Sequence, residues 1–241
     1  RGLGDVYKRQ PILIQHKFQH AYFDKSSSEE FIQILGNHFN KNFVNCVPNQ
    51  IHSSVISFGS HSQKGCKIDA DGLYGDKSNL NLWVYTADCM PIFFADRRTR
   101  NVAALHCGRK GLEKKIIKNL IKVFDDLGHS RDDLLVAIGP SISKKHYLVD
   151  EKTIKEFYRK AENKELSKIL SKSEKNFNDT NLSILEEQNL NQINLKRSAY
   201  RQLLNEKIPD KNIDISNLCT YELKNEFNSW RRSKTFSRQW N

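Results

Sequence analysis

Three short apolar segments near the middle of the chain constrain its fold more than any other feature. Residues 82–86 and 92–95 have the continuous apolar character of strands buried on both faces of a sheet, and residues 102–105 form a third such segment. After the third segment come a glycine-containing turn and apolar residues at helical spacing, namely Ile116, Ile117, Leu120, Ile121, Phe124 and Leu127. The sequence therefore predicts a strand, glycine turn and helix unit within an α/β fold.

The flanking segments add elements of both kinds. Pro11–Phe23 predicts an extended strand, and a short amphipathic helix should follow it, with Phe31, Ile32, Leu35 and Phe39 on its apolar face. We also expect strands at 55–58, 134–138 and 213–220, a helix at 194–204, and a lysine-rich helix with a loop at 149–181.

The first ten residues are excluded from these predictions. Residues 5–10, with the sequence Asp-Val-Tyr-Lys-Arg-Gln, resemble a translated sequencing-library adaptor rather than a piece of protein. We therefore expect residues 1–10 to be an artefact and residues 11–241 to form a single catalytic domain.

Neither a membrane span nor a secretion signal is evident in the sequence. No apolar run reaches the length of about 18 residues that a spanning helix needs. The five cysteines are scattered without a Cys-x-x-Cys pair, so we expect reduced thiols. These features predict a cytoplasmic protein with no membrane partner.

The formal net charge of +11 allows two kinds of partner. A nucleic-acid-binding protein would gather its lysines and arginines into one stripe, whereas here they are spread along the whole chain. The same surplus would attract a phosphate-bearing or anionic small substrate. We therefore expect no nucleic-acid partner, although a basic, non-enzymatic binding protein stays open as an alternative.

Cys89 and His106 are the first candidates for chemistry, because each lies where an apolar strand ends. Taken singly, such a cysteine is more often an inert core residue, and such a histidine is usually just hydrogen-bonded. Gly108 and Gly111 strengthen the functional reading, since glycines permit close backbone approach to a ligand. Together with His52 these residues are too far apart in sequence to form a local metal motif.

Ordered motifs along the chain carry a more specific signal. Each is a short string, and the strings are Gln50-Ile51-His52, Asp69-Ala70-Asp71-Gly72, Thr86-Ala87-Asp88-Cys89-Met90-Pro91, His106-Cys107-Gly108-Arg109-Lys110-Gly111, Gly139-Pro140-Ser141-Ile142, Leu218-Cys219-Thr220 and Phe227-Asn228-Ser229-Trp230-Arg231-Arg232. In sequence and in order they resemble the motifs of the YfiH-type laccase-domain ("polyphenol oxidase") family. The resemblance spans nearly the whole chain.

This resemblance implies a fold and a metal site. The fold would be a single α/β/β/α layered domain with mixed β-sheets. The metal, zinc with copper as the alternative, would be held by the residues matching His52, Cys89 and His106, with a fourth position open for water or substrate. Asp88 would serve as a catalytic proton acceptor or would orient a histidine, and a structural role in the turn is equally compatible.

The chain departs from the family pattern after His106. Where the family usually reads His-Ala-Gly-Trp-Arg-Gly, this chain has Cys107, Arg109 and Lys110, so an aromatic residue is replaced by a cation. Strand alternation turns Cys107 away from His106, and we therefore expect it to be structural. Four cations are candidates for phosphate binding, each with a solvated surface charge as the alternative reading: Arg109, Lys110, Arg231 and Arg232.

The resemblance implies an enzyme and leaves several activities open. We favour a zinc-dependent purine nucleoside phosphorylase acting on adenosine, inosine and S-methyl-5'-thioadenosine, with adenosine deaminase activity, working as a monomer or homodimer. A copper polyphenol oxidase is less favoured, because the eight histidines include no His-x-His pair. The third reading is a cysteine hydrolase that cleaves an amide in peptidoglycan metabolism, with Cys89 as nucleophile and His106 as base.

Overall fold

The computed structural model describes residues 7–8, 10–25, 43–61, 68–162 and 191–241. Its centre is a six-stranded sheet with the order β11-β10-β8-β9-β5-β4. The strands are β4 (Ile56–Phe58), β5 (Gly72–Tyr74), β8 (Met90–Asp96), β9 (Val102–Cys107), β10 (Leu134–Ile138) and β11 (Ile213–Ile215). The outer pairs β10–β11 and β4–β5 are parallel and the pairs between them are antiparallel, so the sheet is mixed.

Strand β8 shows why the central strands are apolar throughout. Ile92 and Phe94 face one hydrophobic cluster, whereas their neighbours Phe93 and Ala95 face another on the opposite side of the sheet. All seven residues of β8 are buried. A strand covered on both faces has no solvated side, and its sequence therefore shows a continuous apolar run instead of alternation.

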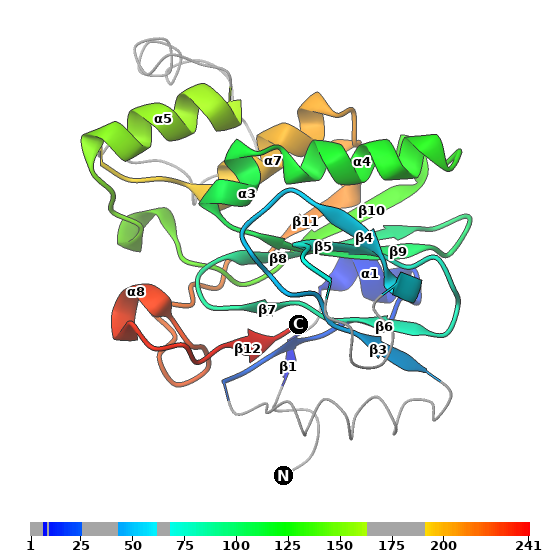
Figure 1. Cartoon of the computed structure of the whole chain (residues 1–241), viewed down its shortest axis with the longest axis horizontal. Coiled ribbons are helices and arrows are strands. Elements are labelled where there is room, and N and C mark those ends of the chain that lie inside the picture. Colours follow the sequence, from blue (N-terminus) through cyan, green and yellow to red (C-terminus); the bar gives the residue numbers. More distant parts are fainter. Residues whose placement is uncertain (1–6, 9, 26–42, 62–67, 163–190) are drawn as a thin grey trace.

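One face of the sheet is covered by helices, drawn above it in Figure 1. These are α3 (Arg109–Glu113), α4 (Ile116–Asp126), α5 (Glu151–Glu162) and α7 (Leu195–Asn205). The apolar side of α4 is fully buried against the sheet, as its helical spacing predicts. Short 3₁₀ turns join several elements, at Gly59–His61, Arg131–Asp133, Lys144–His146 and Asp210–Asn212.

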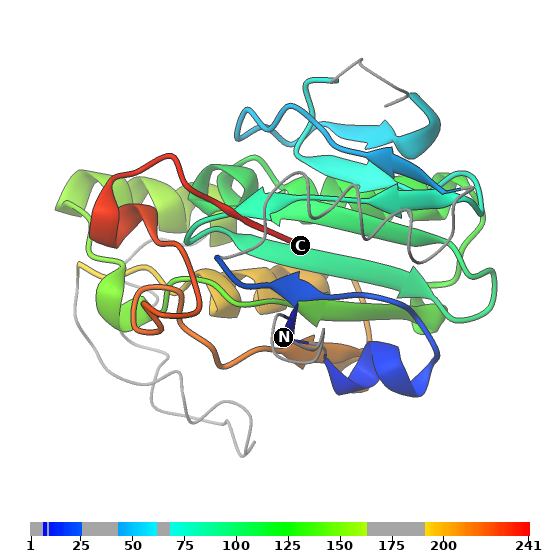
Figure 2. The same ribbon diagram turned by 90° about the horizontal axis from the view of Figure 1, so that it is seen from below.

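The other face is covered by α1 (Pro11–Gln15) and by pairs of short strands (Figure 2). The pairs are β1 (Tyr7–Lys8) with β2 (Tyr22–Phe23), β3 (Val44–Cys46) with β6 (Leu80–Leu82), and β7 (Tyr85–Thr86) with β12 (Gln239–Trp240). Helix α8 (Trp230–Ser233) precedes the last strand. The mixed, layered α/β fold expected from the sequence is confirmed.

Several element boundaries differ from the sequence prediction. The strand predicted at Pro11–Phe23 was wrong at its start, because Pro11 occupies the first turn of helix α1, a position that suits its fixed φ and missing N–H. The strand predicted at 82–86 is divided between β6 and β7, which lie in separate sheets. The strand predicted at 213–220 ends at Ile215.

The helical predictions also need adjustment. The helix predicted from Ile116 to Leu127 is confirmed as α4, but the glycine turn before it contains a further short helix, α3. Lys115, in a left-handed conformation (φ 62°), separates the two. Helix α5 occupies the start of the lysine-rich segment. The helix predicted around Phe31 and Phe39 lies outside the described residues. Within the described part of the chain, no helix has the length and apolarity needed to cross a membrane.

Candidate metal centre

His52, Cys89 and His106 come together in space although they are far apart in sequence. His52 lies in the loop before β4, Cys89 in the turn before β8, and His106 near the end of β9. Strand pairing places Pro91 opposite His106, which brings the turn that carries Cys89 to that end of β9. One ligand atom from each side chain lies within 4.8 Å of the other two. We call this group the His–Cys–His cluster.

Asp71 orients the cluster, a role that the sequence analysis did not assign to it. Its carboxylate accepts a hydrogen bond from Nδ1 of His106 at 2.7 Å and is completely buried. Occupation of Nδ1 leaves Nε2 of His106 as the nitrogen available to a ligand. The sequence signal was present in the Asp69-Ala70-Asp71-Gly72 string, but nothing local shows that this carboxylate faces a histidine.

The same carboxylate shapes the loop that carries His52. Asp71 accepts the backbone N–H groups of Ile51, His52 and Ser53, at 3.2, 3.0 and 2.5 Å, and the hydroxyl of Ser53 at 2.7 Å. These bonds hold His52 in a left-handed backbone conformation with φ 57°. Such a conformation is uncommon outside glycine and persists where the surroundings enforce it. Asp71 thus positions both histidines of the cluster.

Gly108 makes room for the thiol. A Cβ atom added to Gly108 would lie 2.4 Å from Sγ of Cys89, far inside van der Waals contact. The backbone of Gly108 is extended (φ −97°, ψ −170°), a conformation open to any residue. Glycine is therefore needed at this position because a side chain would collide with the Cys89 thiol, and not because the backbone conformation requires it.

The electrostatics of the cluster favour charged forms of both Cys89 and His106. Burial raises the pKa of Cys89, but the imidazoles of His106 and His52 outweigh it and lower the pKa to about 6. Burial lowers the pKa of His106, yet the Cys89 thiolate and the Asp71 carboxylate raise it to about 9. Opposite charges at hydrogen-bond range stabilise each other. The metal-free cluster is therefore a thiolate–imidazolium pair near neutral pH.

These features suit a transition metal. Two imidazole nitrogens and one thiolate are ligands that zinc commonly takes, and the carboxylate on Nδ1 is the usual support of a ligating histidine. His106 is buried, Cys89 is half-buried and His52 is exposed, so the cluster has an approach from solvent. The fourth coordination position of a bound metal, open for water or substrate, can face this solvent-exposed side.

Asp88 is placed away from the histidines by its hydrogen bonds. Its carboxylate accepts the hydroxyls of Thr220 and Ser229, at 2.7 and 3.0 Å, and the backbone N–H of Arg231 at 2.7 Å. Its backbone is left-handed, with φ 85°. Asp88 thus joins the Cys89 turn to the C-terminal segment. The carboxylate that orients a histidine of the cluster is Asp71.

Two of the four predicted cations, Arg109 and Arg231, lie beside Tyr147, and Tyr147 lies near Cys89 of the cluster. Arg109 pairs with Glu113, and its guanidinium also lies close enough to the Tyr147 hydroxyl for the two groups to interact. Burial raises the pKa of the Tyr147 phenol, and the charge of the nearby Cys89 thiolate raises it further. The guanidinium of Arg231 lies over the Tyr147 ring, 5.1 Å from its centroid. Arg109, Tyr147 and Arg231 therefore form one side of the site.

The other predicted residues lie differently. Lys110 is exposed on the first turn of α3. Arg232 donates to the backbone carbonyls of Thr220, Tyr221 and Phe227, at 2.8, 2.7 and 2.7 Å, which commits much of its guanidinium to holding the C-terminal segment. Cys107 is fully buried in the main core, facing away from the cluster as strand alternation predicts.

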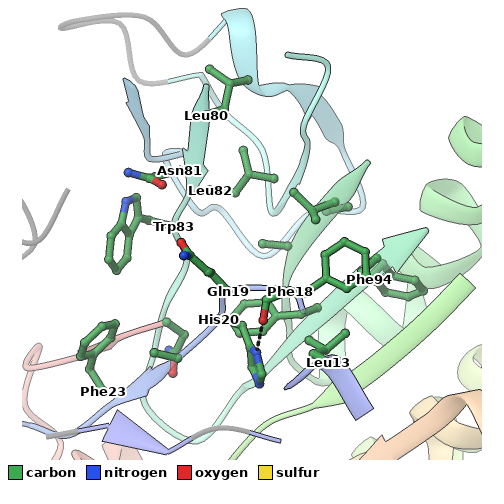
Figure 3. A pocket seen from close by; sticks show the side chains of 17 residues that line it. Leu13, Phe18, Gln19, His20, Phe23, Leu80, Asn81, Leu82, Trp83 and Phe94 are labelled. Carbon is green, nitrogen blue, oxygen red and sulfur yellow. Dashed lines mark hydrogen bonds between the residues drawn. The ribbon is translucent and has the colours of Figure 1, made fainter. Parts of the chain in front are cut away.

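An apolar pocket elsewhere does not belong to this site. The lining of this cavity, of about 240 Å³, includes Leu13, Phe18, Leu82, Trp83 and Phe93. Figure 3 labels most of the larger side chains that line it. His20 also lines it and contacts the carbonyl of Phe18 at 3.3 Å. None of its lining residues is a member of the His–Cys–His cluster or one of the four predicted cations.

Comparison with known proteins finds one matching family model and several similar curated proteins. A family model described as "Multi-copper polyphenol oxidoreductase laccase" matches residues 24–241. A Synechocystis protein named purine nucleoside phosphorylase slr1573 is 29% identical over 71% of this chain and 66% of its own length. Purine nucleoside phosphorylase Rv2149c of Mycobacterium tuberculosis is 33% identical over 42% of this chain. The match spans only 40% of that relative's own length.

Solved structures support the fold. Neisseria meningitidis protein NMB0706 superposes with a TM-score of 0.70 at 22% identity, covering 92% of this chain and 86% of its own. The hypothetical protein YfiH of Bacillus licheniformis gives a TM-score of 0.71 at 20% identity, covering 91% of this chain and 90% of its own.

Proposed function

We propose that this chain, which belongs to the family described as "Multi-copper polyphenol oxidoreductase laccase", is a zinc-dependent purine nucleoside phosphorylase. Its substrates would be adenosine, inosine and S-methyl-5'-thioadenosine together with inorganic phosphate. Relatives that carry the name purine nucleoside phosphorylase, in Synechocystis and in Bacteroides thetaiotaomicron, support this choice.

The observation that carries the proposal is the His–Cys–His cluster with its buried orienting carboxylate. Three donor atoms lie within 4.8 Å of one another, and Asp71 is hydrogen-bonded to His106 on the side away from them. His52, Cys89 and His106 would hold the metal. A bound zinc ion would supply a Lewis acid that polarises an oxygen of the substrate or of water.

The residues around the cluster suit an anionic co-substrate. In phosphorolysis a phosphate oxygen forms a bond to C1′ of the ribose while the bond from C1′ to the purine nitrogen breaks. The electron pair of that bond stays with the base, which takes up a proton. Arg109 and Arg231, which both lie near Tyr147, would bind the phosphate oxygens and hold them in line with C1′.

Lys110 and Arg232 would have lesser roles in this scheme. Lys110 is exposed and would add long-range attraction for phosphate, since its ammonium is a mobile point charge. Arg232 would act mainly by fixing the segment that carries Arg231. Adenosine deamination, in which water adds at C6 and ammonia leaves, is a second proposed activity of the same site.

Product analysis tests the proposal. Purified protein loaded with zinc is incubated with adenosine and phosphate, and adenine, inosine and ribose 1-phosphate are quantified by chromatography. Adenine formation that depends on phosphate supports phosphorolysis, and inosine formation supports deamination. No product above the level of a Cys89→Ala variant would remove the proposal.

A second candidate, a cysteine hydrolase, is favoured by one specific observation. The metal-free cluster has the arrangement of a cysteine nucleophile, a histidine base and a carboxylate that orients the base, in Cys89, His106 and Asp71. Such an enzyme attacks an amide carbonyl with its thiolate, expels the amine with a proton from histidine, and then hydrolyses the thioester.

Chelation separates the two candidates. A zinc-dependent phosphorylase loses turnover after chelation and regains it when zinc is returned. A cysteine hydrolase keeps its activity in chelator and loses it when Cys89 is alkylated. Assays of both reactions on the same chelated sample decide between them.

A further inference from the structure

A second group of ligand-type side chains lies outside the His–Cys–His cluster. His146, Cys219 and Glu222 each offer one donor atom, and these three atoms lie within 4.8 Å of one another. Cys219 is buried, with 3% of its surface exposed, whereas His146 is half-buried and Glu222 is exposed. Solvent therefore reaches the group from the side of the imidazole and the carboxylate. We call this group the second cluster.

Backbone hydrogen bonds hold together the two loops that supply these residues. Ser141 forms a parallel β-bridge with Cys219, and the N–H of Thr220 donates to the carbonyl of Ser141 at 3.2 Å. The N–H of Ser143 donates to Sγ of Cys219 at 3.3 Å. The position of the sulfur relative to the 141–146 loop is therefore fixed by the fold and not by flexible side chains.

The imidazole is also held in place. Its ring stacks on Tyr221 with centroids 4.4 Å apart and planes 15° apart, and its Nε2 lies 2.8 Å from the carboxylate of Glu222. Around a tetrahedral zinc ion, donor atoms lie about 3.3–3.8 Å apart, as bond lengths of about 2.0–2.3 Å require. The His146–Glu222 contact would open from 2.8 Å, and the separations from the sulfur, which are at most 4.8 Å, would adjust to reach that spacing.

We propose that the second cluster is a binding site for a zinc-class divalent cation, held by His146, Cys219 and Glu222. Imidazole nitrogen, thiolate sulfur and carboxylate oxygen are all common zinc ligands, whereas Mg²⁺ and Ca²⁺ prefer oxygen ligands alone. Zinc binds sulfur as thiolate and imidazole as the neutral ring, so the proton of the Cys219 thiol leaves to solvent and Nε2 of His146 binds the ion without its proton. A doubly charged ion then faces one thiolate and one carboxylate, so the complex is neutral.

Buried Lys196 lies beside this site. Its ammonium donates to the carbonyls of Ser216 and Leu218, at 2.6 and 2.8 Å. These bonds hold the backbone that leads directly into Cys219, so the approach to the sulfur is fixed from this side as well.

A metal here would clamp the loop that leads into the candidate active site. His146 directly precedes Tyr147, which lies near both Arg109 and Cys89. The ion would join that loop to residues 219–222, which the Asp88–Thr220 hydrogen bond already connects to the Cys89 turn. The second cluster is thus placed to stabilise the site without touching substrate.

Metal stoichiometry tests the proposal without any activity assay. The whole protein and its variants are equilibrated with the same buffered free Zn²⁺ and analysed by mass spectrometry of the metal. We expect about two equivalents in the unaltered protein, about one in Cys219→Ser, and about one in Cys89→Ser. The control is Cys46→Ser, because Cys46 is a buried thiol that donates a hydrogen bond to the carbonyl of Gly59 and belongs to neither cluster. This variant should keep about two equivalents of zinc.

Variants at the exposed ligands keep the test decisive if Cys219→Ser fails to fold. Glu222→Gln and His146→Gln alter residues at or near the surface, and each should weaken binding of the second equivalent by about 10-fold or more. Cobalt gives an independent signal: a thiolate-to-Co²⁺ absorption band in Cys89→Ser that disappears in the Cys89→Ser/Cys219→Ser double variant. A metal content that Cys219→Ser leaves unchanged, or full binding in Glu222→Gln with unchanged affinity, overturns the proposal.

Discussion

Asp71 and His106 form the central pair of the candidate site: a fully buried carboxylate accepts the Nδ1 proton of a buried imidazole at 2.7 Å. Backbone bonding reinforces the pair, since the N–H of His106 donates to the carbonyl of Asp71 at 2.8 Å. The ring is held by both its backbone and its side chain. Its Nε2 is thereby directed toward Cys89 and His52, which gives the cluster its geometry.

We expect Asp71→Asn to weaken zinc binding by about 10- to 100-fold, because the orienting carboxylate also raises the basicity of the ligating imidazole. Competition with a chromophoric chelator measures the affinity. The substitution should also destabilise the metal-free protein, by about 3 kcal/mol, since three backbone N–H groups lose a charged acceptor. Unchanged zinc affinity would contradict this role.

Acid sensitivity should change in the same variant. Burial raises the pKa of Asp71, but the hydrogen bonds from His106 and Ser53 lower it to about 2, below the ordinary value of 3.8. A lowered carboxyl pKa stabilises the fold above the ordinary value, and this stabilisation is lost as the pH falls toward about 2. Unfolding free energy measured from pH 5 to 2.5 should therefore fall more steeply for the unaltered protein than for Asp71→Asn.

Gly108→Ala should remove metal from the His–Cys–His cluster while the fold is kept. The new methyl group would lie 2.4 Å from the Cys89 sulfur, so the thiol must swing away from the two histidines. Gly111→Ala is the matched control in the same turn, because the methyl group added there meets nothing closer than 3.4 Å. Zinc affinity and far-ultraviolet circular dichroism are measured for both. Normal zinc affinity in Gly108→Ala would show that the thiol is not a ligand.

In chelated protein, the rate of Cys89 alkylation by iodoacetamide should rise with pH about a midpoint near 6, because the two imidazoles lower the pKa of the thiol against the effect of burial. The thiolate is present above that pH and lost below it. In Asp71→Asn the midpoint should move upward, since a less basic His106 stabilises the thiolate less. Alkylation at Cys89 is followed by peptide mass spectrometry. A midpoint near the ordinary value for a free thiol would refute the paired state.

Arg109→Ala should raise the KM for phosphate by about 10-fold, the effect of one lost charge-assisted hydrogen bond of about 1.5 kcal/mol. Lys110→Ala is the neighbouring control, and because Lys110 is exposed its effect should be less than about 2-fold. Initial rates of adenine formation at varied phosphate concentration measure both. Equal effects of the two substitutions would show that Arg109 attracts phosphate only as part of the general surface charge.

The sequence predicted the central strands best, for a physical reason. The cores of β8, β9 and β10 are buried on both faces, and a continuous apolar run records that burial directly. The strand predicted at 82–86 failed because Trp83 and Val84 are buried by other segments after β6 has ended. Burial alone does not distinguish a strand from a packed connection.

The three residues proposed as metal ligands were identified by the resemblance to a family, because their spacing in the sequence does not form a recognisable metal motif. Their convergence depends on the pairing of β8 with β9 and on the loop fixed by Asp71, which are contacts between residues distant in sequence. Asp88 was expected to accept a proton, to orient a histidine or to play a structural role in the turn. Its left-handed backbone and its hydrogen bonds to Thr220 and Ser229 fit the structural role, and no local pattern indicates that direction of the carboxylate.

The ligand shell of the bound ion is the most direct measurement of the central claim. Zinc K-edge X-ray absorption on Cys219→Ser protein, which lacks the second cluster's sulfur, reports the donors in the His–Cys–His cluster alone. The account predicts one sulfur at about 2.3 Å and two imidazole nitrogens at about 2.0 Å, with a light-atom fourth ligand. A shell without sulfur, or one unchanged when Cys89→Ser is added, would contradict it.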